Sequence, residues 1–283
     1  MKHILLPVDF SSDSWNAVKY ALYLFENEES TFYILNSYQA SPSELSSRIN
    51  RARGTRLHDA LRRSAEYEME DFMKRIQDSH NNAKHTIKSV LVSDSLVNAV
   101  GKTAISKNIS YIFMGTKGST AAKEIFMGSS TVSIIKNIDF CPVIAVPGDY
   151  SYDIPEQILF PTDYKRVFEE QEIKPLKELA SLWSSTVRVL HIQEDSTFTE
   201  EQHNNKEELK KLLSGLTIAE EEINQHKSSI AEIINEYSQN TSIGMLAMVN
   251  NQHSFLEKLL NERVIKRVAF KAGKPFLVMP EVH

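Results

Sequence analysis

Short, almost wholly apolar runs alternate with longer amphipathic segments along the first half of the chain. Runs of this kind are typical of strands that are buried on both faces of a parallel sheet. After an opening strand at His3–Phe10, the pattern predicts strands at 31–35, 86–92, 111–114 and 143–146, separated by helices at 15–25, 58–77, 95–107 and 131–137. Strict alternation of strand and helix predicts a doubly wound α/β fold with right-handed crossovers.

The same sequence pattern occurs twice along the chain. The opening run His3–Phe10 recurs as Gln157–Tyr164 at an offset of 154 residues, and both copies contain Ile, Leu, Pro and Asp at matching positions. The proline-bracketed run Cys141–Pro147 recurs as Lys274–Pro280. We therefore predict two tandem Rossmann-like domains, residues 1–148 and 154–283, each with a five-stranded parallel sheet. In the second domain the predicted strands are Ile158–Phe160, Val187–His191, Leu216–Ala219, Met245–Val249 and Phe276–Met279.

Composition narrows the classes of partner. The 283 residues are 41% hydrophobic and 24% charged, which suits packed cores rather than disorder. A net charge of −5 gives no basic field for nucleic acid or an anionic membrane. No apolar run approaches the roughly 20 residues that span a bilayer, and the first residues lack the features of a signal peptide. We therefore expect a cytoplasmic protein without a membrane or nucleic-acid partner. The single cysteine, Cys141, is expected to be an inert core thiol.

Glycines concentrate after the fourth predicted strand. The chain has nine glycines, and three of them, Gly115, Gly118 and Gly128, fall within fourteen positions. Ser129 and Ser130 follow and open a predicted helix. Glycine lets a ligand approach the backbone closely, and a helix N-terminus offers free N–H groups to an anion. Ligands of such sheets bind beyond the carboxyl ends of the strands, where the strand order reverses. This segment therefore predicts a phosphate site, with Asp9 at the border of the same crevice.

The spacing Gly-x2-Gly-x9-Gly-Ser-Ser, together with the runs Ile4–Ser11 and Cys141–Pro147, resembles the universal stress protein family. The resemblance extends over essentially the whole chain in two copies. It implies pairing of the two domains about a pseudo-two-fold axis and binding of ATP, or of ADP or AMP, with or without Mg²⁺. Carried over by position, the residues implied to hold the nucleotide are Pro7, Val8, Asp9, Ser37, Met114, Gly115, Gly118, Gly128, Ser129 and Ser130. Of these, Ser37 departs from the aliphatic residue that is more usual in the family.

The second half lacks this pattern. Aligned on Met114 and Met248, Gly115 corresponds to Val249 and Gly118 to Gln252, and the third glycine falls at Asn261 or Glu262. Side chains at these positions would crowd or repel phosphates, so we expect one nucleotide per chain. The apolar helical stretch Phe255–Phe270 is instead predicted to pack, in part at an interface.

Other polar groups are assigned ordinary roles. The basic stretch Arg48–Arg56 is expected to be a solvated loop, although closure over phosphate is an alternative. Asp163 is expected to cap a strand end or helix. His191 and His253 are expected to be packed or solvated rather than zinc ligands, and Glu220–Glu222 is expected to be a solvated face.

Three functions remain open on the sequence. The preferred one is a nucleotide-binding protein of the stress response without catalytic residues. The sequence leaves its oligomeric state open, and a homodimer is one alternative. The second is a slow ATPase or nucleotide transferase, although the chain has no Walker motif. The third is a scaffold whose second domain binds a protein or a lipid.

Overall fold

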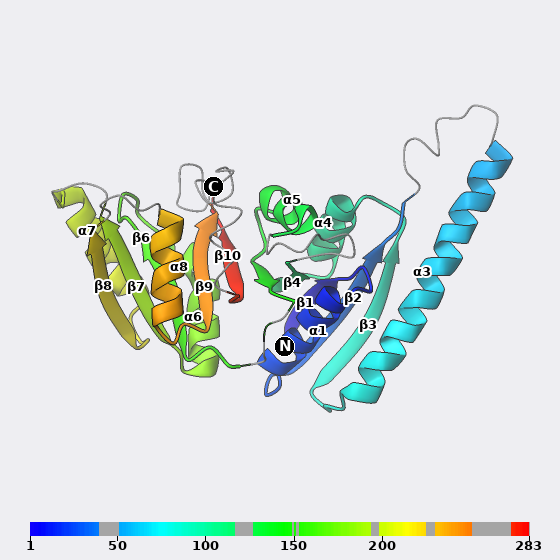
Figure 1. Cartoon of the computed structure of the whole chain (residues 1–283), viewed down its shortest axis with the longest axis horizontal. Helices are drawn as coiled ribbons and strands as arrows, with labels where there is room; N and C mark the ends of the chain where they lie inside the picture. The colour runs from blue at the N-terminus through cyan, green and yellow to red at the C-terminus, as the bar shows by residue number, and fades with distance from the viewer. Residues whose placement is uncertain are drawn as a thin grey trace.

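A computed structural model of the chain describes residues 1–39, 51–116, 127–148, 150, 153–193, 198–224, 230–250 and 273–282. Within these residues, ten strands form one continuous sheet, with helices on both of its faces (Figure 1). The strands are β1 Lys2–Pro7, β2 Ser30–Ser37, β3 His85–Val92, β4 Tyr111–Gly115, β5 Val143–Val146, β6 Gln157–Thr162, β7 Thr186–Gln193, β8 Ile218–Asn224, β9 Met245–Asn250 and β10 Phe276–Pro280. The helices are α1 Ser12–Leu24, α3 Arg51–Ser79, α4 Leu96–Ser106, α5 Ser129–Asn137, α6 Glu170–Trp183, α7 Glu200–Leu212 and α8 Ile230–Asn240.

The strand order confirms the predicted doubly wound architecture. The order is β3-β2-β1-β4-β5-β10-β9-β6-β7-β8, so the second half repeats the order of the first half in reverse across the sheet. Every pairing inside a half is parallel. The pairing of β5 with β10 is antiparallel and places Ile144 opposite Leu277. The two five-stranded sheets therefore merge along one seam, which the sequence did not predict.

Two apolar clusters sandwich this sheet. One contains buried residues of α1, α3, α6 and α7, and the other contains buried residues of α4, α5 and α8. The long helix α3 contributes a stripe of buried residues at helical spacing, Ala65, Met69, Phe72 and Ile76, and its N-terminal part projects beyond the sheet (Figure 1). Each half therefore places helices on both faces, as right-handed crossovers require.

The first helix after β1 begins with a side-chain cap. The hydroxyl of Ser11 accepts a hydrogen bond from the backbone N–H of Ser14 at 3.2 Å, which satisfies one of the unpaired donors of the first turn. Trp15, Val18 and Leu22 then bury one face of α1 against the sheet. The cap and the apolar spacing together fix where the chain turns back from β1.

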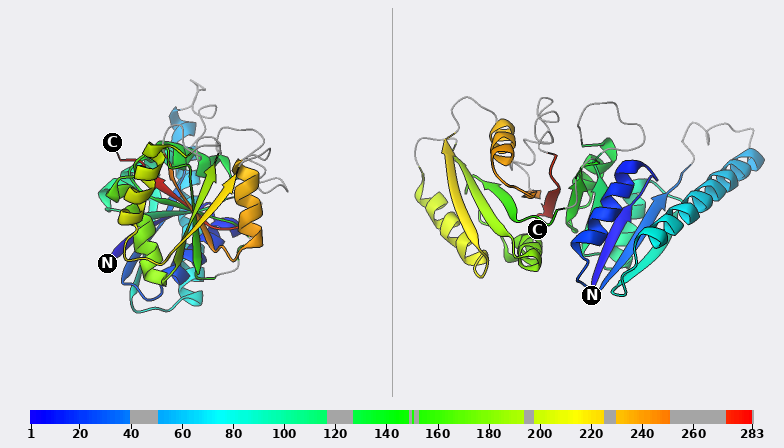
Figure 2. Two further views of the ribbon diagram at one scale, coloured as in Figure 1. Left: turned by 90° about the vertical axis from the view of Figure 1, so that its left-hand side faces the viewer. Right: turned by 60° about the horizontal axis from the view of Figure 1, so that its bottom comes forward.

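Helix α6 of the second half also contacts the first half. The indole N–H of Trp183 donates to the Leu24 carbonyl at 2.9 Å, and the Tyr111 hydroxyl donates to the Glu178 carboxylate at 3.0 Å. Lys2 forms an ion pair with the same Glu178 carboxylate. Figure 2 shows the two halves side by side along the sheet. The halves are therefore joined by backbone pairing and by side chains.

The outermost strand of the second half, β8, differs from its prediction. It begins at Ile218 rather than Leu216 and extends to Asn224. It includes Glu220–Glu222, whose side chains are exposed, as the sequence predicted. Lys206 and Lys210 pair with Glu220, and Arg188 pairs with Glu221. β8 pairs with a neighbouring strand on one side only, and charged residues are common in such edge strands. Because it lacks a buried apolar run, its position was predicted too early in the sequence.

We predict that the two halves unfold as one cooperative unit. The two tryptophans, Trp15 in α1 and Trp183 in α6, report on different halves. In urea titrations of Trp15→Phe and of Trp183→Phe, the fluorescence of the remaining tryptophan and the circular dichroism of the whole chain should therefore give the same midpoint within each variant. Leu277→Ala removes a fully buried side chain at the seam. It should lower the free energy of unfolding that both tryptophans report by about 2–5 kcal/mol. The control is Ile105→Ala, at a side chain that is 71% exposed. Two separate midpoints would refute the coupling.

Candidate functional site

The candidate site lies at the carboxyl ends of β1 and β4. β1 is flanked by β2 on one side and by β4 on the other. The chain leaves β1 for α1, which packs in one apolar cluster, and leaves β4 for α5, which packs in the other. Two neighbouring strands thus send their helices to opposite faces of the sheet, which is the topological switch point where doubly wound folds form a crevice.

The β1 side of the crevice is anchored by backbone bonds. The N–H of Val8 donates to the Leu35 carbonyl at 2.7 Å, and the buried amide of Asn36 donates to the Val8 carbonyl at 2.8 Å. Pro7 is the last residue of β1, and Ser37 is the last residue of β2, two positions beyond the Pro7–Leu35 pair. The structure therefore brings three predicted residues, Pro7, Val8 and Ser37, to one edge of the sheet.

Asp9 is exposed at the same edge and organises the turn into α1. Its Oδ1 accepts hydrogen bonds from the Ser11 hydroxyl at 2.5 Å and from the Ser11 N–H at 3.2 Å. Phe10 between them adopts a left-handed conformation with φ 61°. Asp163 has the matching role in the second half, where its Oδ1 accepts the Lys165 N–H at 3.0 Å. The repeated aspartate is thus a turn residue in both halves.

On the β4 side, α5 is fastened directly to the end of the strand. The Thr131 hydroxyl donates to the Gly115 carbonyl at 2.8 Å, and the Gly128 N–H donates to the Thr116 carbonyl. The Thr116 N–H donates to the Val146 carbonyl of β5 at 2.9 Å. These bonds place the first turn of α5 beside the exit of β4, although Gly128 follows Thr116 by twelve positions in the sequence.

The first turn of α5 has the features of an anion site. Gly128 is its N-cap residue and makes no side-chain cap, and Ser129 and Ser130 are exposed. The first intrahelical bond runs from the Val132 N–H to the Gly128 carbonyl, so the preceding N–H groups have no partner within the helix. Donors of this kind, with the positive end of the helix dipole, favour a negative charge.

The structure supplies a further reason for glycine at position 115. A β-carbon there would lie 2.8 Å from the carbonyl oxygen of Asp13, in the first turn of α1. The close approach is therefore that of the protein's own backbone. Met114 is buried, with 5% of its surface exposed, in the cluster on the opposite face. Gly118 lies outside the described residues.

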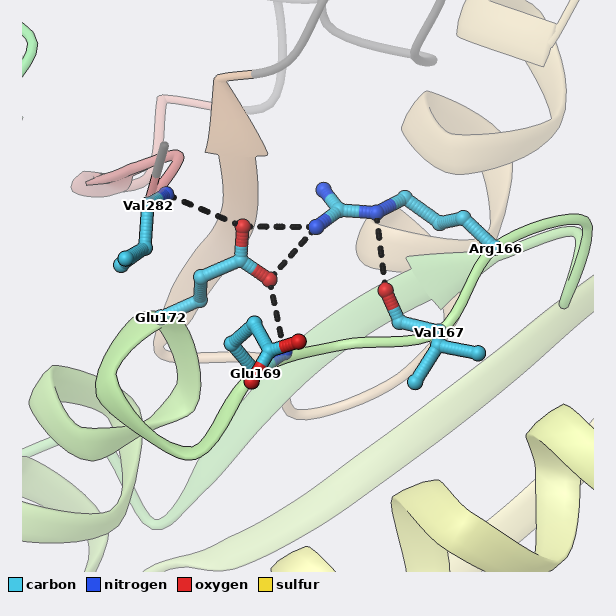
Figure 3. A network of polar contacts seen from close by, with 5 residues as sticks. All are labelled: Arg166, Val167, Glu169, Glu172 and Val282. Carbon is cyan, nitrogen blue, oxygen red and sulfur yellow. Dashed lines mark hydrogen bonds and ion pairs between the residues drawn. The ribbon is translucent and has the colours of Figure 1, made fainter.

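At the equivalent place in the second half, the chain is built differently. Val249 stands where the first half has Gly115, and it is buried. The connection from β6 to α6 is longer than that from β1 to α1 and carries Arg166 (Figure 3). The guanidinium of Arg166 donates to both oxygens of the fully buried Glu172 carboxylate, at 2.6 and 2.5 Å. The predicted counterparts Gln252, Asn261 and Glu262, the stretch Phe255–Phe270 and His253 lie outside the described residues.

Two backbone donors complete the network around Glu172. The Glu169 N–H donates to it at 2.9 Å, and the Val282 N–H, beyond the end of β10, donates at 3.2 Å (Figure 3). Arginine and backbone N–H groups around one anion are what a phosphate would need, and here an internal carboxylate supplies the negative charge. In the second half, the positive charge of Arg166 is therefore already neutralised by the Glu172 carboxylate.

His191 is a packed histidine in the second half. Its ring is 3% exposed, stacks on Tyr164 at a centroid distance of 4.9 Å and meets the edge of Phe198 at 5.0 Å. Burial lowers the pKa of His191, and the Glu222 carboxylate opposes this in part. Burial also raises the pKa of the Cys141 thiol to about 12, which fits an inert core residue. In the part of the chain that the structure describes, no cluster of three metal-ligating side chains is present.

Sequence reasoning missed three residues that shape the crevice. Asn36 directly follows the apolar run Phe32–Leu35 of β2, Thr131 follows the two serines, and Asn16 donates from α1 to the Pro147 carbonyl at 2.8 Å. All three are buried polar side chains that bond to backbone carbonyls. An asparagine at the end of a buried apolar run is the signal that could have identified Asn36.

The topology and the paired halves define the class: two tandem Rossmann-like α/β units that share one sheet. The family model described as "Universal stress protein family" matches residues 1–147. The chain therefore belongs to the universal stress protein family. The comparison with curated protein sequences found no match. No helix among the described residues is long and apolar enough to cross a membrane.

Solved structures with the same fold cover nearly the whole chain. A universal stress protein from Archaeoglobus fulgidus DSM 4304 is 16% identical, with a TM-score of 0.71 and 98% coverage of both chains. A protein of Pseudomonas aeruginosa UCBPP-PA14, described as a universal stress protein, is 11% identical with a TM-score of 0.59, over 99% of this chain and 94% of that one. The cytoplasmic domain of a prokaryotic cation chloride cotransporter is 10% identical with a TM-score of 0.51, over 99% and 95%. These similarities confirm the fold.

We predict that Gly115→Ala destabilises the protein by about 1–3 kcal/mol, because the new methyl group would overlap the Asp13 backbone. The matched control is Gly101→Ala in α4, where the methyl group would meet the flexible end of Ile138 at 3.3 Å and alanine favours the helix. Chemical denaturation measures both. Equal stability of the two variants would show that the contact with Asp13 does not require glycine.

We also predict a loss of stability in mild acid. The pKa of His191 is lowered from 6.5, chiefly by burial, and so are those of His80 and His85, which stack on each other in the first half. The unfolded chain then binds more protons than the folded chain, so the free energy of unfolding falls as pH drops through about 6.5. His191→Gln should make this slope shallower. Leu246→Ala, which removes a buried side chain from the other apolar cluster, should lower stability and keep the slope. An unchanged slope in His191→Gln would contradict the assignment.

Proposed function

We propose that the protein is an ATP-binding regulatory protein that holds one adenine nucleotide in its first half. One observation carries the proposal: the uncapped first turn of α5, with Ser129 and Ser130 exposed, is fastened beside the exits of β1 and β4 at the switch point. The family resemblance of the glycine-spaced segment supports the same assignment. A role in the stress response and a cytoplasmic location are part of the proposal and rest on that resemblance.

The residues present suit a nucleotide. The Gly128–Ser130 turn would hold phosphates through backbone N–H groups and two hydroxyls, with the end of β4 at Met114 and Gly115 beside them. Gly118 is included on the family resemblance alone. Pro7, Val8 and Ser37 would line the adenosine, and Asp9 borders the same edge. ADP or AMP would use the same donors. Mg²⁺ would add positive charge at the phosphates.

The glycine-poor half is proposed to remain empty of nucleotide. Val249 occupies the position of Gly115, and the Arg166 guanidinium is already bonded to Glu172. A phosphate would therefore have to displace a buried carboxylate from its arginine, which is strongly unfavourable. This supports a ratio of one nucleotide per chain.

The enzyme alternative has less support. Asp9 would have to act as the base, but its Oδ1 accepts two hydrogen bonds from Ser11, and this favours its role in the turn. Release of phosphate that purified wild-type protein sustains above a mock preparation would favour a slow ATPase. The scaffold alternative gains if protein or lipid partners bind equally with and without nucleotide.

We predict that Ser130→Asp abolishes tight ATP binding while leaving the fold intact. A carboxylate in the first turn stabilises a helix by about 0.3–1 kcal/mol but would repel phosphates, so affinity should fall about tenfold or more. Ser130→Asn has the same shape without the charge and should bind close to wild type. Calorimetric titration with ATP, with and without Mg²⁺, and mass spectrometry of the co-purified ligand provide the measurements. The proposal would be refuted if wild type bound no nucleotide or if both variants bound ATP equally.

A further inference from the structure

The candidate phosphate helix is also held from the second half. The amide of Asn250 donates to the carbonyl oxygen of Ile135 at 2.9 Å. Ile135 lies in the last turn of α5, and Asn250 is the final residue of β9. The bond therefore crosses from one half of the chain to the other, and it reaches the helix whose opposite end forms the proposed nucleotide site.

Carbonyl groups at the end of a helix have no intrahelical partner and need one from outside. In α5, the Ile138 N–H serves the Ile134 carbonyl, and the Asn137 amide serves the Ser133 carbonyl at 2.7 Å. Both of these donors belong to the first half. The Ile135 carbonyl receives its hydrogen bond from Asn250, so the second half completes the C-terminal end of this helix.

Asn250 and its counterpart in the first half make different hydrogen bonds. It corresponds to Thr116, since each directly follows the pair Met114–Gly115 or Met248–Val249. Thr116 bonds within its own half, to the β5 strand and to Gly128. Asn250 instead directs its amide across the seam (the pairing of β5 with β10), which brings the end of β9 close to the C-terminal end of α5.

We propose that Asn250 is a positioning residue of the nucleotide site, and that through it the second half sets the affinity of the first half for nucleotide. The inference rests on the proposed function. Helix α5 has nine residues, so it is a rigid rod about 13 Å long. Thr131 and Gly128 hold its first turn, and Asn250 holds its last. Releasing the last turn lets the rod tilt and moves the Ser129 and Ser130 donors away from the phosphates.

The coupling works in both directions. If Asn250 favours the arrangement of α5 that binds nucleotide, then nucleotide must favour the Asn250–Ile135 contact by the same free energy. The half without a glycine motif thereby gains a role: a partner that changes the end of β9 would change nucleotide affinity in the other half.

The test compares Asn250→Asp with Asn250→Gln in the full chain. The aspartate has the same shape but cannot donate, and should weaken ATP binding about three- to tenfold, the loss expected for one hydrogen bond. The glutamine retains an amide donor and should recover most of the affinity. The matched control is Asn137→Asp, which removes an amide donor from the same helix end without involving the second half, and should bind within about twofold of wild type. Titration calorimetry gives the affinities, and thermal melting gives stability.

A second readout separates positioning from simple destabilisation. Hydrogen exchange at Met245–Asn250 should slow when ATP binds wild type and should not slow in Asn250→Asp. If Asn250→Asp lowers the melting temperature but binds ATP like wild type, this inference is overturned and the proposed function stands. If wild type binds no adenine nucleotide, the proposed function and this inference fall together.

Discussion

The antiparallel pairing of β5 with β10 is the constraint on which the rest of the molecule depends. A parallel sheet of five strands has an edge strand with unpaired N–H and C=O groups, and each half uses that edge to complete the other. The pairing keeps α1, α3, α6 and α7 in one apolar cluster and α4, α5 and α8 in the other. It also brings α6 against the first half, where Trp183 bonds to Leu24. Without the seam, neither the shared core nor the contact from Asn250 to α5 would exist.

Within this common frame, the two halves solve the same geometric problem with different chemistry. The helix that follows the first strand must pass close to the end of the fourth strand. In the first half, Gly115 makes room for the Asp13 backbone. In the second half a longer connection precedes α6, a valine is accommodated, and Arg166 of this connection pairs with the buried Glu172. The positions beside the first strand differ as well: Asn36 bonds to a carbonyl, whereas the equivalent His191 is enclosed by aromatic rings.

Much of the fold could be predicted from the sequence because buried parallel strands leave a strong signal. Runs such as Tyr111–Gly115 are apolar on both faces, and the repeat indicates that the same unit occurs twice. The edge strand β8 was placed too early because Glu220–Glu222 carries no apolar signal. At the site, the residues that end strands were identified, but the bonds that position them were not. Thr131 and Asn250 act on partners 16 and 115 positions away in the chain, and such contacts depend on strand order and crossing helices rather than on local pattern.

The three glutamates of β8 have a consequence for how the molecule behaves among its own copies. Once the seam is used, the sheet ends at β3 and β8, and an open strand can template further strands without limit. Glu220, Glu221 and Glu222 lie along one of those ends, where Lys206 and Lys210 pair with Glu220 and Arg188 pairs with Glu221. A strand of another copy could pair there only if these charged side chains were rearranged or lost water, which raises the energy of open-ended polymerisation. The same glutamates that weaken the strand signal in the sequence therefore oppose edge-to-edge pairing of β8 with another copy.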